Sequence, residues 1–104
     1  MDNFEISEPK FLYEWDENKN RINIQKHGIS FEEAATAFED PNALTLPDEE
    51  HSMYEDRFWL IGFSSHANLL IVSHCFREGQ VIRIISARKA EKMEKLVYNI
   101  RGEL

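Results

Sequence analysis

The stretch RFWLIGFSSHANLLIVSHCFREGQVIRIISA, residues 57–87, decides the fold because it consists almost entirely of strand-forming segments. Aliphatic and aromatic residues dominate at 57–64, 69–77 and 80–87, and each segment has the length of a strand. The segments SHAN and REGQ between them are typical of turns. The stretch therefore predicts three strands in an antiparallel meander.

The residues before the meander predict a short strand and two helices. FLYEW, residues 11–15, alternates as a short strand does. Asp16 can cap a helix over 17–27, which Gly28 would close.

The second helix is predicted to begin after Ser30, because Ser30 and Glu33 have the spacing of a capping box. The Asp40-Pro41 pair ends it, since the residue before a proline avoids helical backbone. A short strand is predicted next, in the segment NALTLP, and an acidic, mobile connector follows it over 48–56.

A stripe of apolar side chains predicts an amphipathic C-terminal helix, and its members are Ala90, Met93, Val97 and Ile100. The expected fold class is therefore α+β: a short N-terminal strand and two helices, an antiparallel β-meander and a C-terminal helix. The length of 104 residues suits a single domain over 1–104, with residues 1–10 as a flexible N-terminal extension.

The composition is that of an ordinary soluble globular protein, with 42% hydrophobic and 30% charged residues. The apolar runs are far shorter than the roughly 20 residues that span a membrane. The first residues lack the pattern of a secretory signal, and Cys75 has no partner for an intramolecular disulfide. We therefore expect a cytoplasmic protein that does not associate with membranes.

The net charge of −7 argues against a nucleic-acid partner, but the charge is unevenly distributed. Residues 1–56 hold 15 acidic and 4 basic side chains, whereas residues 57–104 hold 4 acidic and 8 basic ones. The C-terminal half can thus present a positive surface to phosphates. Scattered, solvated surface charge explains the same distribution and remains an alternative.

The alternation of side chains sorts the meander into two faces if its turns are short. With Glu78-Gly79 as a two-residue turn and 65–68 as the other loop, one face is apolar, includes Cys75 and packs on the N-terminal helices. The second face is apolar at one end, which the C-terminal helix could cover. Its other end collects Arg57, Trp59, His74, Phe76 and Arg83. A loop of three or five residues at 65–68 would remove the first two from this group.

This group has the composition of a site that binds and cleaves RNA. Cleavage without a metal needs fixed positive charge on the phosphate, which Arg57 and Arg83 would supply, and groups that transfer protons. Glu55 and His74 are the candidates for proton transfer. A structural ion pair between Arg57 or Arg83 and an acid such as Glu55 is an equally good interpretation.

Five side chains are candidates for RNA binding. Trp59 and Phe76 can stack on an unpaired base, as can the nearby Tyr54. Arg77 and Arg88 can widen the basic surface, although either can be a plain surface charge. The four histidines and the cysteine lack the spacing of metal ligands, so we expect neither a metal nor another cofactor.

Three segments of the chain together resemble one protein family. They read YEWDENKNRINIQKHGISFEEAATAFEDP, EDRFWLIGFS and LLIVSHCFREGQVIRIISARKAEKMEKLVY, and they span about residues 13–98. The chain resembles the BrnT toxins of bacterial type II toxin–antitoxin modules. The resemblance implies a small endoribonuclease with a RelE-like fold that acts without a metal cofactor and inhibits translation by cleaving RNA.

The resemblance also implies a partner, an antitoxin of the ribbon-helix-helix type (BrnA-like) that holds the toxin inactive. Operator DNA would be contacted only through this antitoxin, and a basic antitoxin would suit the acidic N-terminal half. The family's motifs fall on His27, Glu55, Arg57, Arg77, Arg83 and Arg88. Arg57 and Arg83 are preferred as catalytic residues because the assignment of faces selects them too.

Two other functions remain open. The chain can be a catalytically inactive, toxin-like binding module that engages the antitoxin and modulates operator binding. An independent DNA-binding regulator is disfavoured by the negative net charge and the missing pattern of a recognition helix.

Overall fold

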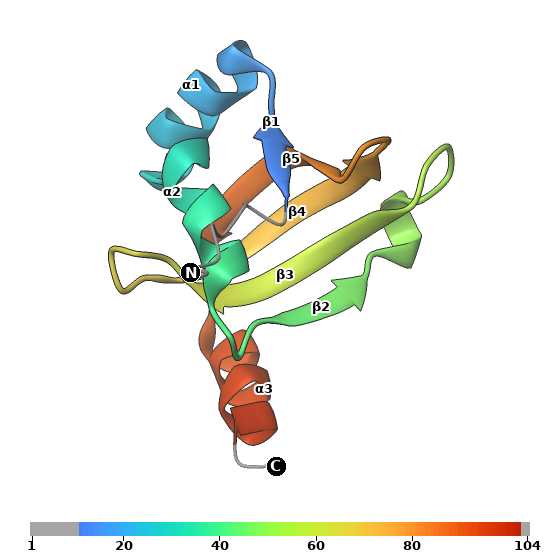
Figure 1. Ribbon diagram of the computed structural model, residues 1–104. Helices are drawn as coiled ribbons and strands as arrows, with labels where there is room; N and C mark the ends of the chain where they lie inside the picture. Colours follow the sequence, from blue (N-terminus) through green and yellow to red (C-terminus); the bar gives the residue numbers. More distant parts are fainter. Residues whose placement is uncertain (1–10, 103–104) are drawn as a thin grey trace, which may run out of the picture.

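Five strands form one mixed sheet in the order β1-β5-β4-β3-β2, and helices lie on both sides of it (Figure 1). The computed structural model describes residues 11–102, so the prediction for residues 1–10 lies outside the described residues. The strands are β1 (Leu12–Glu14), β2 (Leu44–Pro47), β3 (Arg57–Phe63), β4 (Leu69–Arg77) and β5 (Val81–Lys89). The helices are α1 (Glu17–His27), α2 (Phe31–Thr36) and α3 (Lys92–Gly102), with 3₁₀ turns η1 (Ala37–Glu39) and η2 (Glu49–His51).

The predicted α+β class is confirmed, and the sheet is larger than the predicted meander. Strands β2 to β5 pair antiparallel in sequence order, while β1 pairs parallel to β5 at the opposite edge. Within the described part of the chain, no helix is long and apolar enough to cross a membrane.

The N-terminal helices begin and end where their capping residues predict. The Asp16 side chain accepts hydrogen bonds from the backbone N–H groups of Asn18 and Lys19, and Gly28 closes α1 at φ 72°. Ser30 Oγ accepts from the Glu33 N–H at 3.0 Å, which is one half of the predicted capping box. These caps are local interactions, which explains why the sequence alone located them.

The Glu33 carboxylate binds the turn between β3 and β4. It is buried and accepts hydrogen bonds from Ser64 Oγ at 2.7 Å and from Asn68 Nδ2 at 2.8 Å. Burial by itself would raise the pKa of Glu33, but the hydrogen bonds from Asn68 and Ser64 outweigh it and the pKa is lowered. Glu33 therefore connects α2 to the end of the sheet that carries the β3–β4 turn.

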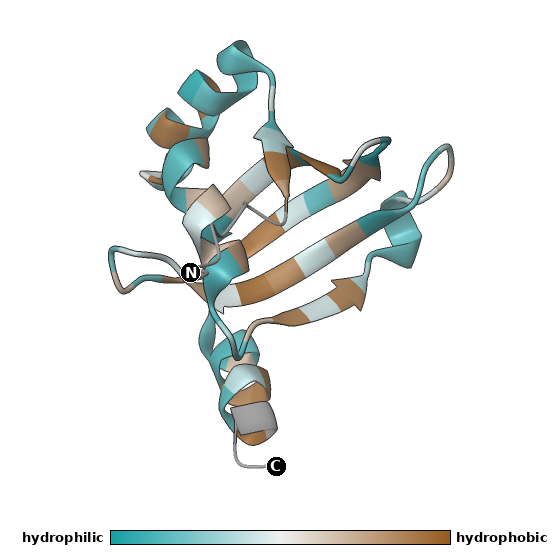
Figure 2. Ribbon diagram, in the orientation of Figure 1, coloured by the Kyte–Doolittle hydropathy of each residue, from teal (hydrophilic) through white to brown (hydrophobic). Residues whose placement is uncertain are grey.

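Helix α1 is attached to the sheet by polar side chains. It is mostly hydrophilic (Figure 2), its Ile22 and Ile24 are exposed, and the side chains that it buries are Asn20 and Asn23. Asn23 Nδ2 donates to the carbonyls of Ile29 and Ala87 at 2.9 and 2.8 Å, and its Oδ1 accepts from the Ala87 N–H at 3.1 Å. Asn23 thereby joins α1 to β5.

Both hairpins differ by one residue from the predicted registers. Phe63 pairs with Leu69, so the first loop has five residues, and Arg77 pairs with Val81, so the second has three. Residues with positive φ make these longer loops possible: Ala67 in the first, and Gly79 and Gln80 in the second. The predicted two-residue turn and four-residue loop are therefore wrong.

Between the β4–β5 turn and a β-bulge at Ser73/His74, the two register errors cancel between β3 and β5, so that β4 alone presents the opposite side chains to each face. Arg57 pairs with Cys75, and Cys75 pairs with Arg83, so these three side chains share a face. His74 and Phe76 consequently point to the opposite side of the sheet. The predicted group of five side chains on one face is wrong for these two residues.

Each face of the sheet has its own hydrophobic cluster. The larger cluster, under α1 and α2, contains Ile29, Phe31, Ala34, Ala37, Leu60, Leu70, Val72, Ile82, Ile84 and Ala87. The smaller one, on the other face, contains Ile61, Leu69, Ile71, Ala90 and Tyr98. The prediction that the C-terminal helix covers the apolar end of this second face is confirmed.

The residues by which α3 makes this contact differ from the predicted stripe. Over residues 92–100 of α3, Tyr98 is the buried side chain, whereas Met93, Val97 and Ile100 are exposed. Ala90 is the one member of the predicted stripe that is buried. The stripe is therefore correct as a helical pattern and wrong as the surface that faces the sheet.

Loss of a proton from Tyr98 should loosen α3 at alkaline pH. Tyr98 Oη donates to Asp40 Oδ2 at 2.7 Å, and burial together with this hydrogen bond raises the pKa of Tyr98 from 10.0 to about 12. Because the folded-state pKa is the higher one, this stabilisation is complete below pH 10 and is lost as the pH rises towards 12. We therefore expect the free energy of unfolding of Tyr98→Phe to decrease less than that of the wild type between pH 10 and 12.

Urea unfolding at pH 8, 10, 11 and 12 would measure the effect as the difference between wild type and variant. Tyr54→Phe is the matched control, because Tyr54 is 94% exposed, and it should follow the wild type at every pH. If the free energies of unfolding of the wild type and of Tyr98→Phe decrease equally between pH 10 and 12, the Tyr98 hydroxyl does not contribute in this way.

Candidate active site

Three arginines from three neighbouring strands lie on one face of the sheet. They lie at the end of the sheet that carries the turn between β4 and β5, and Figure 1 shows where this turn is. Arg57 and Arg83 flank Cys75 in the register of the sheet, and Arg77 lies two residues further along β4 on the same side. We call the arginine face the set Glu14, Glu55, Arg57, Cys75, Arg77 and Arg83.

Two of the three arginines form ion pairs. Arg83 Nη1 lies 2.9 Å from Glu14 Oε2, and Arg77 binds Glu55 and also lies within 4.0 Å of Glu14. All four side chains are between 33% and 42% exposed, so these pairs contribute little to stability. The interpretation as a structural ion pair is thus confirmed for Arg83, with Glu14 as the acid, whereas Glu55 pairs with Arg77 and not with Arg57. The pairs are open enough for an anionic ligand to replace them.

Arg57 differs from its neighbours. Its Nε is buried and has no hydrogen-bond partner, and within residues 11–102 its guanidinium forms none of the ion pairs of this face. A buried donor without an acceptor is energetically unfavourable and is rare in folded proteins. In the described part of the chain, the Arg57 Nε–H group is therefore a buried donor that no other group accepts.

The Glu55 carboxylate and the Cys75 thiol lie between the arginines. Cys75 Sγ is 3.6 Å from Glu55 Oε1. The hydrogen bond from Arg77 holds the pKa of Glu55 below its usual value, and burial raises the pKa of Cys75. Glu55 is thus a stable carboxylate and Cys75 a neutral thiol. The assignment of Cys75 to the helix-covered face is wrong, because β4 is turned over.

A hollow of about 270 Å³ opens beside Arg57. Its lining residues are Glu50, His51, Met53, Tyr54, Glu55 and Arg57, most of which come from the connector before β3. This connector was predicted to be mobile, but it contains η2 and is anchored by the buried carboxylate of Asp48. Sequence reasoning missed Asp48 and His51, whose only signal was their spacing of three residues.

The comparison with protein-family models gave a match over residues 15–94 to "Ribonuclease toxin, BrnT, of type II toxin-antitoxin system". The chain belongs to the BrnT family. A solved structure that it resembles is the crystal structure of the ribonuclease toxin BrnT of Brucella abortus, with a TM-score of 0.63 and 29% identity. The likeness covers 79% of this chain and 99% of that chain. A comparison with curated protein sequences gave no match.

His74 is a core residue of this BrnT chain. It is 1% exposed, its ring packs against Phe38 with centroids 4.8 Å apart, and its Nδ1 lies 3.0 Å from the carbonyl oxygen of Val72. Burial lowers the pKa of His74 and thus favours the neutral ring. The prediction that His74 lies on the same face as Arg57 and Arg83 is wrong, and the same reversal of β4 moves Phe76 away from the arginines.

Trp59 and Arg88 lie on the same face as Arg57 but have other partners. Trp59 is half-buried and its Nε1 donates to Asp48 Oδ2 at 3.1 Å. Arg88 binds Glu94 of α3 through two hydrogen bonds of 2.9 and 2.7 Å. In the sheet it pairs with Ile71, whereas Arg83 pairs with Cys75. The structure therefore separates Arg88 from the other three arginines and makes it an anchor of α3.

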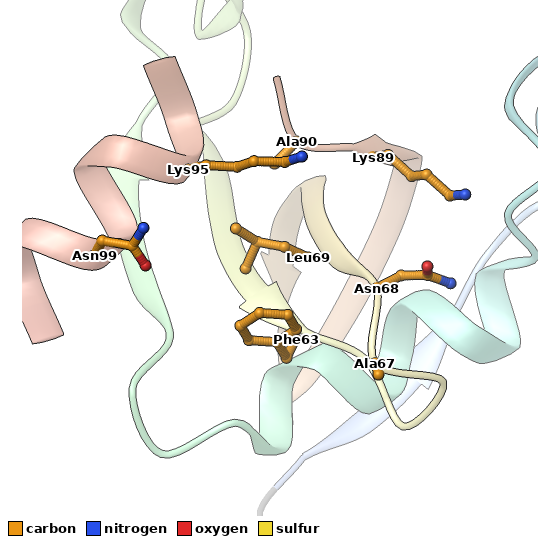
Figure 3. Close-up of a pocket in the computed structure, with 8 residues that line it drawn as sticks. All are labelled: Phe63, Ala67, Asn68, Leu69, Lys89, Ala90, Lys95 and Asn99. Carbon is orange, nitrogen blue, oxygen red and sulfur yellow. The ribbon is translucent and has the colours of Figure 1, made fainter. Parts of the chain in front are cut away.

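A second hollow, of about 440 Å³, lies at the opposite end of the sheet, where α3 meets the β3–β4 turn (Figure 3). Its lining residues are Phe63, Ala67, Asn68, Leu69, Lys89, Ala90, Lys95 and Asn99. It shares no residue with the arginine face. Within residues 11–102 of this BrnT chain, no group of three or more His, Cys, Asp or Glu side chains is arranged to hold a metal ion.

Proposed function

We propose that this BrnT-family toxin is an endoribonuclease that holds an RNA phosphate on the arginine face, cleaves the chain without a metal cofactor and thereby inhibits translation. The observation that carries the proposal is Arg57, whose buried Nε has no acceptor among residues 11–102. Arg57 lines the adjacent hollow, and its guanidinium can bind a phosphate oxygen there, because the guanidinium fork matches the geometry of phosphate oxygens.

The proposed reaction uses the 2′-hydroxyl of the RNA as its nucleophile. O2′ forms a bond to phosphorus while the bond from phosphorus to O5′ breaks, which leaves a 2′,3′-cyclic phosphate and a free 5′-hydroxyl. Negative charge increases on the non-bridging oxygens in the transition state, and Arg57, Arg77 and Arg83 lie together where they can stabilise it. The half-exposed pairs of Arg77 and Arg83 leave these side chains accessible to RNA.

An unpaired base needs an aromatic surface beside the phosphate site. Tyr54 lines the hollow and is 94% exposed, so its ring is available for stacking. The indole of Trp59, two residues along β3 from Arg57, is half-buried and already hydrogen-bonded to Asp48. We therefore assign base stacking to Tyr54 and a supporting role to Trp59.

The partners of the toxin follow from its family. Membership in a toxin–antitoxin family implies an antitoxin. We infer that this antitoxin is of the ribbon-helix-helix type and that operator DNA is contacted only through it, as the resemblance to BrnT toxins implies. The classification of the fold as RelE-like rests on the same resemblance.

The second candidate function is a catalytically inactive module that binds the antitoxin and modulates operator binding. The pairing of Arg83 with Glu14 and of Arg77 with Glu55 favours it, because it gives both arginines structural partners. The two candidates differ in whether the folded protein cleaves RNA.

The test is cleavage of end-labelled single-stranded RNA by the purified chain, as naked RNA and in a cell-free translation mixture, with and without EDTA. We expect cleavage in at least one of these settings, products that end in a 2′,3′-cyclic phosphate, and no inhibition of naked-RNA cleavage by EDTA. Co-expression with the adjoining reading frame should relieve the growth arrest that the toxin causes.

Two results would contradict this proposal in different ways. Cleavage that EDTA abolishes and Mg²⁺ restores would show that the reaction depends on a metal ion. Absence of cleavage in both settings, together with normal growth despite verified folded protein, would favour the inactive binding module.

A further inference from the structure

A buried carboxylate orients a histidine at the edge of the arginine face. Asp48 is 5% exposed, and its two oxygens lie 3.1 and 2.9 Å from His51 Nδ1. The same carboxylate accepts a hydrogen bond from Trp59 Nε1 at 3.1 Å. The Asp48 side chain is therefore fixed by two ring N–H groups, one from the connector and one from the sheet.

The backbone around Asp48 is fixed to the first residue of β3. The Asp48 N–H donates to the Arg57 carbonyl at 2.8 Å, and the Ser52 hydroxyl donates to the Asp48 carbonyl at 2.6 Å. The Arg57 N–H in turn donates to Ser52 Oγ at 2.9 Å. His51 is thus held at a defined place relative to Arg57, although the two are six residues apart.

The hydrogen bond to Asp48 determines which nitrogen of His51 is available to a ligand. A carboxylate can only accept, so Nδ1 carries the proton and Nε2 of the neutral ring has a free lone pair. The side chain of His51 is 58% exposed and lines the hollow together with Arg57. A base with a fixed tautomer therefore lies beside Arg57, whose buried Nε has no partner among the residues that the structure describes.

We propose that His51, oriented by Asp48, is the proton-transfer residue of the ribonuclease site. This inference rests on the proposed function above and identifies its general base. In the reaction, His51 Nε2 takes the proton of the 2′-hydroxyl as O2′ bonds to phosphorus, and the departing O5′ takes its proton from water. Asp48 acts through His51 as a positioning residue.

The other titratable side chains near the arginines are less suited to this role. His74 is buried on the opposite face, and Glu55 is held as a carboxylate by Arg77. His66 lies in the β3–β4 turn, where its Nδ1 is 3.4 Å from the Glu33 carboxylate. His51 is the histidine that lines the hollow with Arg57.

The pair of His66 and Glu33 provides a matched control, because it is also an exposed imidazole beside a buried carboxylate but lies at the other end of the sheet. Single-turnover cleavage of labelled single-stranded RNA would be measured for the wild type, His51→Ala, Asp48→Asn and His66→Ala, together with RNA affinity. We expect His51→Ala to lose about a hundredfold or more in rate while RNA affinity changes little. Asp48→Asn should lose less, and His66→Ala should cleave as the wild type does.

Added imidazole should partly restore cleavage by His51→Ala, an effect that a purely structural role would not produce. If His51→Ala cleaves within threefold of a wild type that Arg57→Ala inactivates, the assignment of His51 is overturned while the proposed function stands. If the folded wild type itself does not cleave RNA, the proposed function fails and this inference fails with it. Since His51 is largely exposed, its replacement should not prevent folding.

Discussion

Replacement of Arg57 by alanine should reduce the rate of RNA cleavage about 10²–10³-fold, the usual loss when one donor to transition-state charge is removed. The folded protein should be as stable as the wild type or slightly more stable, because the change removes a buried Nε that has no hydrogen-bond partner. Arg57→Lys should cleave at an intermediate rate, since it keeps the charge and loses the planar fork. Single-turnover cleavage and urea unfolding would measure both effects.

Arg88→Ala is the matched control for this prediction. Arg88 lies on the same face of the sheet, but it is bound to Glu94 and anchors α3. We expect this variant to cleave RNA as the wild type does and to lose some stability. If Arg57→Ala unfolds while its folded fraction cleaves at the wild-type rate, Arg57 is a structural residue and the inactive binding module becomes the better description.

Replacement of Asn23 by alanine should lower the free energy of unfolding by about 3 kcal/mol, since it leaves several buried backbone groups without partners. These groups are the carbonyls of Ile29 and Ala87 and the N–H of Ala87. The helix has little apolar surface to compensate, because the side chains that α1 buries are asparagines. Urea unfolding near neutral pH would measure the loss, and faster hydrogen exchange at the Ala87 N–H would localise it.

Asn18→Ala is the control within the same helix. The Asn18 side chain is exposed and interacts with Arg21 on the surface of α1. Its replacement should change the free energy of unfolding by less than about 0.5 kcal/mol. A loss of under 1 kcal/mol for Asn23→Ala would mean that water satisfies these backbone groups in the variant and that Asn23 does not hold α1 on the sheet.

The attachment of α1 shows why its position was not predictable from its own residues. The buried face of an amphipathic helix can be predicted from a stripe of apolar residues in its sequence. In α1 the buried residues are Asn20 and Asn23, and the residues that Asn23 binds lie 6 and 64 positions away. A polar residue that is buried for its hydrogen bonds is indistinguishable in the sequence from one that faces water.

The candidate site was partly predictable. Arg57 and Arg83 do lie close together, and Glu55 reaches the same face because it is two residues from Arg57. Glu14 was missed because it is 69 residues from Arg83 and meets it only through the parallel pairing of β1 with β5. Sequence spacing carries no information about such a contact.

The features that the sequence determined by itself depend on interactions between residues that are close in the sequence. Capping by Asp16, Gly28 and Ser30, the strand character of residues 57–87 and the α+β order of elements all depend on neighbours within a few positions. The family resemblance, which the match over residues 15–94 confirms, is likewise a property of ordered motifs.

Only the tertiary structure decided which face each strand of the meander presents to the helices. The alternation of side chains shows which residues of one strand share a face. The length of the connecting loop sets the register between two strands, and a shift of one residue exchanges the side chains on the two faces of the second strand. The five-residue and three-residue loops turned β4 over, so that Cys75 pairs with Arg83, where His74 was predicted. The connector brought His51 to the same site through a buried carboxylate, because hydrogen bonds to Trp59 and to the Arg57 backbone fix its path.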